Sequence, residues 1–123
     1  MNIGSNVNFF LGLQLQLKIN HWQTKGLGRH MAFGSTYDSL QDLVDTYVEE
    51  SMGKYGRFVL DEETKTIQLS NLSELDMKSF IVTVSDTLIQ FTDELDPMDT
   101  NLLNIRDEML GLINKLAFLL TLE

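Results

Sequence analysis

The stretch from Asp96 to Leu119, DPMDTNLLNIRDEMLGLINKLAFL, decides the fold. Its apolar residues recur at spacings of three and four: Leu102, Ile105, Met109, Leu112, Leu116 and Leu119. This spacing marks one face of an α-helix, and such a seam is suited to packing on other helices. Asp96 can cap a helix and Pro97 is tolerated at its first position, so we expect the helix to begin there.

Two more helices are predicted upstream by the same test. One begins at Ser73, with Leu72 and Met77 placed to form a hydrophobic staple. Its apolar face consists of Met77, Phe80, Ile81, Val84, Leu88 and Phe91. The other covers residues 31–52, has its apolar face at Tyr37, Leu40, Val44, Tyr47 and Val48, and ends at Gly53 or Gly56.

The first segment fits two patterns. Leucine and isoleucine alternate with other residues from Leu11 to Ile19, which is typical of a strand. The same segment also has apolar stripes at helical spacing. A single strand before three helices would have little to pair with, so we predict a helix.

Residues 57–70 contain two short alternating runs, 58–60 and 66–69, separated by a segment that can turn. They predict either a small hairpin or an ordered crossover loop. The chain is therefore expected to be all-α: a single four-helix bundle over residues 1–123, with this crossover between its second and third helices.

Composition narrows the function classes. The chain has no cysteine, which excludes disulfides, thiolate zinc sites and cysteine nucleophiles and fits a reducing compartment. No signal peptide and no membrane-spanning run is evident, so we expect a soluble cytoplasmic protein without membrane contact. The formal net charge of −9 and the scattered cations argue against direct DNA binding.

Candidate metal ligands fall in two places. Asp38, Asp42, Asp45 and Glu49 lie at spacings of four, three and four, so they share one helix face. They form either a solvated acidic stripe or a set of oxygen ligands for a divalent cation. The two histidines, His21 and His30, flank a glycine-containing turn, and a mixed imidazole and carboxylate set suits iron or zinc better than calcium.

Residues 15–26, LQLKINHWQTKG, resemble the end of the first helix in the Dps family of mini-ferritins. That family typically has a His-Trp pair followed by Lys-Gly, here His21-Trp22 and Lys25-Gly26. A second histidine follows early in the next helix, then Asp and Glu four residues apart, as at His30, Asp45 and Glu49. The resemblance covers residues 15–50 specifically and the rest loosely.

The resemblance implies a ferritin-like bundle that forms a homo-oligomer: at least a dimer and, in that family, a dodecameric shell. It also implies an iron site at a dimer interface, with His21 and His30 from one subunit facing Asp45 and Glu49 of another. Iron(II) bound there would be oxidised by peroxide or oxygen, a ferroxidase activity. Trp22 would lie beside this site as a core or interface aromatic residue.

The chain departs from the family pattern near the second histidine. Gly34 stands where the family usually has an acidic residue, and the loop before His30 is shorter than usual. These departures favour weaker iron binding, or a bundle that has kept a structural or binding role and lost the oxidation chemistry.

Overall fold

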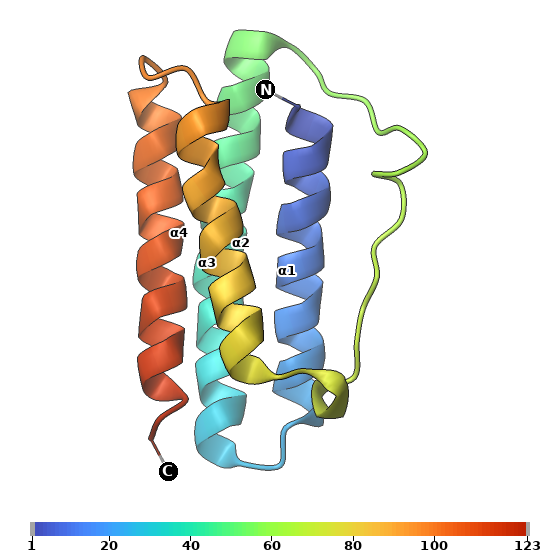
Figure 1. Cartoon of the computed structure of the whole chain (residues 1–123), viewed down its shortest axis with the longest axis vertical. Helices are drawn as coiled ribbons and strands as arrows, with labels where there is room; N and C mark the ends of the chain where they lie inside the picture. The colour runs from blue at the N-terminus through green and yellow to red at the C-terminus, as the bar shows by residue number, and fades with distance from the viewer. Residues whose placement is uncertain (1, 123) are drawn as a thin grey trace.

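A computed structural model describes residues 2–122 and contains four long helices (Figure 1). They are α1 (Ile3–Gln23), α2 (Leu27–Tyr55), α3 (Met77–Glu94) and α4 (Thr100–Leu119), with a short 3₁₀ helix, η1 (Leu72–Glu74), before α3. Helix α1 packs on α2, α2 on α4, and α3 on α4. The prediction of an all-α four-helix bundle with a crossover between its second and third helices is confirmed.

The polar residues of α1 explain why its sequence alternates like a strand. Gln14, Gln16 and Asn20 are buried inside the protein, whereas Leu11 and Leu15 are about two-fifths exposed. Gln16 donates a hydrogen bond from Nε2 to Asn20 Oδ1 across one helical turn (2.9 Å). Buried amides therefore occupy positions that a simple amphipathic helix would give to apolar residues, which weakens the helical periodicity.

The core contains the apolar faces predicted for α2, α3 and α4. At its centre lies an aromatic cluster in which Phe10 meets the ring of Tyr47 at 5.0 Å and that of Phe91 at 5.7 Å, both edge to face. Asn6 Nδ2 donates to the Tyr47 hydroxyl at 3.4 Å. Burial raises the pKa of Tyr47 well above its ordinary value, so this residue stays neutral in the core.

The crossover from α2 to α3 runs along the outside of α1 (Figure 1). Three amide side chains of α1 hold it there. Asn8 donates to the carbonyls of Thr64 and Thr66, Gln16 exchanges two hydrogen bonds with the backbone of Ser70, and Gln23 accepts from the backbone NH of Leu72. Of the two alternatives for this segment, the ordered loop is present, and residues 2–122 contain no strand.

The start points predicted for the last two helices are wrong. Helix α3 begins at Met77 with Asp76 as its N-cap, because the Ser73 region forms η1, where Glu74 accepts a hydrogen bond from the backbone NH of Asn71. Met77 is therefore the first residue of α3, and the predicted staple does not precede this helix. Helix α4 begins at Thr100, because Asp96 instead accepts from the backbone NH of Met98 in a local turn.

The described part of the chain contains no candidate for a membrane-spanning helix. None of the helices within residues 2–122 combines the length and the apolar character needed to cross a bilayer.

Candidate functional site

The two histidines meet at one end of the bundle. His21 lies in the last turn of α1 and His30 in the first turn of α2, joined by the short connection of residues 24–26. Their rings stack with centroids 3.8 Å apart and planes inclined by 19°. His21 Nδ1 is 2.7 Å from the carbonyl oxygen of His30, and His30 Nδ1 is 2.7 Å from that of His21.

This reciprocal pairing fixes which nitrogen of each ring carries hydrogen. A carbonyl oxygen only accepts, so each Nδ1 donates, and in a neutral ring the lone pair is then on Nε2. Metal-binding histidines are commonly oriented by such a bond from the nitrogen that does not bind the metal. The short loop therefore brings the two histidines together, and Nε2 of each oriented ring is the nitrogen that a metal could use.

Gly34 lies one turn beyond His30 and is in contact with the His21 ring. A Cβ atom added at Gly34 would approach His21 Cε1 and Nδ1 to 2.8 Å each. Real Cβ atoms essentially never come this close, so any side chain here requires His21 to move. The glycine at this position thus has a steric reason: it makes room for the stacked histidine pair.

Asp45 and Glu49 do not join this pair within one chain. Both are exposed on α2, and Asp45 lies fifteen residues beyond His30 on the same helix, roughly 22 Å away at 1.5 Å per residue. Asp38 and Asp42 are exposed as well. Within residues 2–122, no group of three or more histidine, aspartate and glutamate side chains is arranged to hold a metal ion. One chain therefore supplies the imidazoles and the carboxylates at separate places.

A cation and two aromatic rings lie next to the histidines. Lys18 Nζ lies 4.7 Å from the centroid of the Tyr37 ring on α2 and 5.5 Å from that of Trp22. Trp22 itself is 65% exposed, so the expectation that it is a core residue is wrong, and the interface role stays a prediction. Lys18 thus bridges the outer faces of α1 and α2 beside the histidine pair.

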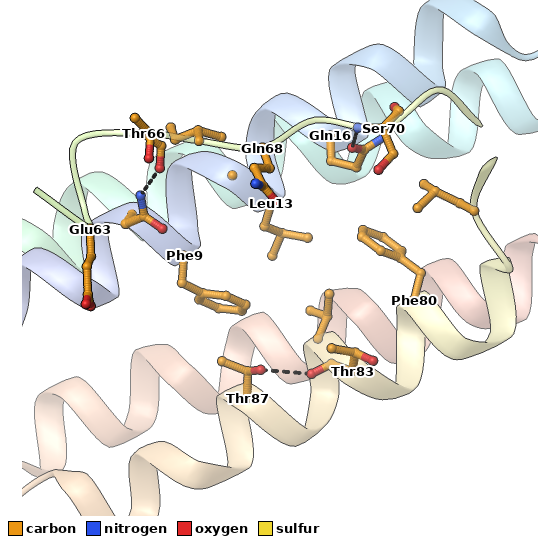
Figure 2. A pocket seen from close by; sticks show the side chains of 15 residues that line it. Phe9, Leu13, Gln16, Glu63, Thr66, Gln68, Ser70, Phe80, Thr83 and Thr87 are labelled. Atoms are coloured by element: carbon orange, nitrogen blue, oxygen red, sulfur yellow. Dashed lines mark hydrogen bonds between the residues drawn. The ribbon is translucent and has the colours of Figure 1, made fainter. Parts of the chain in front are cut away.

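A cleft lies elsewhere, between α1, the crossover and α3 (Figure 2). It has a volume of about 580 Å³ and an apolar floor that includes Phe9, Leu13 and Phe80, with hydroxyl and amide groups around it. Glu63 is the one charged residue among the described residues that line it. Since no titratable pair or nucleophile is assembled there, its size alone does not make it a catalytic site.

Sequence reasoning missed a buried carboxylate at the opposite end of the bundle. Asp99 is 1% exposed and forms hydrogen bonds with Lys54 and Tyr55 from the end of α2. The bonds from Lys54 and then Tyr55 hold the pKa of Asp99 below its ordinary value. No local signal distinguishes this aspartate from Asp96, because its partners lie more than forty residues away in the sequence.

Comparison with known protein families gives one match. A family model aligns with residues 21–120, which contain His21, His30, Asp45 and Glu49. The chain belongs to DUF5856, a family of unknown function. No curated protein and no solved structure matches this DUF5856 chain. The match therefore establishes the family and assigns no activity, and the resemblance to Dps proteins stays a prediction.

Proposed function

We propose that this protein binds iron(II) at a site shared by two copies of the chain. His21 and His30 of one copy and Asp45 and Glu49 of the other supply the ligands, and the bound iron(II) passes electrons to peroxide or oxygen and becomes iron(III). The observation that carries this proposal is the stacked histidine pair, whose Nδ1 atoms are both engaged by backbone carbonyls. Imidazole nitrogen and carboxylate oxygen together suit iron.

The positions of the ligands along α2 favour an antiparallel pairing of two copies. Asp38 lies about midway between His30 and the Asp45–Glu49 pair. A two-fold axis crossing α2 near Asp38 would bring His30 of one copy opposite the carboxylates of the other. Such an isologous interface creates two equivalent sites.

Exposed apolar residues on the outer faces of α1 and α2 support such an interface. Leu11, Leu15 and Trp22 follow one another at spacings of four and seven on α1, and Met31 on α2 is 62% exposed. Exposed apolar and aromatic side chains of this kind are typical of surfaces that a partner covers.

An alternative function is a structural or binding bundle without oxidation activity. Gly34 favours it, because the contact with His21 leaves no room for a carboxylate at this position. The proposed site then has one carboxylate fewer than in the family it resembles. A stable oligomer without iron(II) oxidation would be the expected behaviour of such a protein.

The first experiment measures iron(II) binding by calorimetry without oxygen and then ferric absorbance after oxygen is admitted. We expect saturable binding that is lost in a His21→Ala/His30→Ala variant and in an Asp45→Asn/Glu49→Gln variant. Asp86→Asn/Asp93→Asn removes the same charge at exposed positions of α3, outside the proposed interface, and serves as the control. Binding without oxidation, or no binding at all, supports the alternative, and equal binding by all variants contradicts the proposed iron site.

Mixing the two inactive variants tests whether the site is shared. A mixed dimer of the histidine variant and the carboxylate variant has one site with all four ligands. Random mixing of equal amounts should therefore restore about a quarter of the wild-type sites, given a two-fold symmetric dimer. A mixture in which subunits exchange but no binding returns would rule out a site shared in this way.

A further inference from the structure

A second cleft lies between α3, α4 and the first turn of α2. It has a volume of about 460 Å³, and most of its surface is apolar. Met77, Ile81 and Val82 of α3 form one wall, and Ala117 and Leu120 at the end of α4 form the other. This volume lies within the range of small-molecule sites in proteins.

Two cations lie in the same cleft. Arg29 and Lys78 both line it and both are exposed. The ion pairs within residues 2–122 are Lys54–Asp99, Lys65–Glu62 and Arg106–Asp107, so neither cation has a carboxylate partner in the described chain. Arg29 Nη2 donates to the carbonyl of Leu120 over a long distance of 3.4 Å.

The position of these cations is unusual for this chain, whose net charge is −9. Most of its acidic residues lie in the half of the bundle that contains the end of α2 and the loop between α3 and α4, and Glu74 and Asp76 are the exceptions just before α3. An apolar cleft with two unpaired cations complements a ligand that has an apolar body and an anionic group.

We propose that this cleft binds a single-chain anionic amphiphile, a molecule with one acyl chain and a carboxylate head. The chain would lie between Ile81, Val82 and Leu120, and the carboxylate would accept hydrogen bonds from Arg29 and Lys78. None of these residues belongs to the proposed iron site, so either proposal can fail without the other.

Calorimetry with sodium dodecanoate below its micelle-forming concentration tests the head group. We expect saturable binding of one dodecanoate per chain. 1-Dodecanol should bind at least about tenfold more weakly, because its hydroxyl group is neutral and cannot form an ion pair with Arg29 or Lys78. The proposal is wrong if dodecanoate shows no saturable binding or if both ligands bind equally.

Two charge variants test whether dodecanoate binding depends on the cations of the cleft or on the overall positive charge of this end of the protein. Arg29→Gln/Lys78→Gln should weaken dodecanoate binding at least about tenfold. Lys25→Gln/Lys115→Gln removes the same charge outside the cleft and should leave the affinity unchanged. An equal loss in both variants would mean that charge, not the cleft, attracts the ligand.

A cleft variant and a matched control variant on α3 test the apolar wall. Val82 and Ile89 are both 53% exposed on α3, but only Val82 is among the residues of this cleft. Val82→Asn should weaken binding several-fold and Ile89→Asn should not. Vesicles with and without phosphatidylglycerol complete the test, since binding to anionic vesicles but not to free dodecanoate would identify a lipid surface and overturn the proposal.

Discussion

Replacing Gly34 with alanine tests whether the stacked histidines are a fixed feature of the protein. The added Cβ would lie 2.8 Å from two atoms of the His21 ring, so the ring must turn away. It then loses the hydrogen bond from Nδ1 to the His30 carbonyl and the stacking on His30, whereas the reciprocal bond to the His21 backbone can persist.

The expected change in the free energy of unfolding follows from comparison with Gly111, where an added side chain meets open space. Gly111 lies in the middle of α4, and a Cβ there meets nothing within 4 Å. Gly111→Ala should raise the free energy of unfolding by about 1 kcal/mol through helix propensity. Gly34→Ala gains the same term but loses one hydrogen bond and one ring contact, each worth about 1 kcal/mol. The two variants should therefore differ by about 2 kcal/mol.

Guanidinium unfolding followed by circular dichroism measures this difference. The same substitution at Gly34 in a His21→Ala background should be stabilising, since the ring that it strikes is gone. If Gly34→Ala stabilises the wild-type chain as much as Gly111→Ala does, the histidine pair is not held as described. The same result would remove the steric reason for glycine at this position.

Two further predictions concern the buried polar contacts. The pKa of Asp99 is lowered in the folded protein, so its contribution to stability is present above the ordinary carboxyl pKa and is lost as the pH falls through the folded value. The Asp99→Asn variant should therefore have a lower free energy of unfolding than wild type at neutral pH. The difference between the two free energies should narrow below about pH 4 in unfolding titrations. Gln16→Leu should speed amide hydrogen exchange at Ser70, because Gln16 Oε1 accepts from that NH at 2.8 Å; unchanged exchange there would mean that other contacts hold the crossover.

Helix spacing predicted the fold because each helix buries one continuous face. On α3 the expected residues Val84, Leu88 and Phe91 are buried, and so are Leu40, Val44 and Tyr47 on α2. The first helix could not be recognised from periodicity alone. One of its buried amides, that of Gln16, bonds to the backbone of Ser70 in a crossover about fifty residues further along the chain, and a local window does not contain this partner.

The predicted start points of α3 and α4 are wrong for a related reason. Asp96 does accept a hydrogen bond from a nearby backbone NH, as a capping residue should, but in a separate turn that precedes the helix. The residue at the N-cap position of α4 is Asp99, whose side chain is bonded to Lys54 and Tyr55 instead of to the helix. Capping residues therefore mark turns in the sequence, and tertiary contacts decide which turn begins the helix.

Part of the candidate site was accessible from the sequence. The placement of His21 and His30 on either side of one short turn predicts that they lie at the same end of the bundle. The sequence does not reveal that their rings stack or that Gly34 contacts one of them, since both depend on the angle at which α1 and α2 pack. From the sequence, Gly34 looked like a missing metal ligand. In the structure, the absence of a side chain at Gly34 makes room for the stacked rings of His21 and His30.

The distribution of charge adds an independent argument on how two copies would associate. Glu49, Glu50, Asp93, Glu94 and Asp96 lie toward one end of the bundle, and Lys25, Arg29, Lys78 and Lys115 lie toward the other. Side-by-side parallel copies would bring the acidic ends together, whereas antiparallel copies place each acidic end beside a basic one. The histidines lie at the basic end of α2, and Asp45 and Glu49 lie toward its acidic end. The orientation favoured by these charges is therefore the one that would bring the carboxylates of one copy to the histidines of the other.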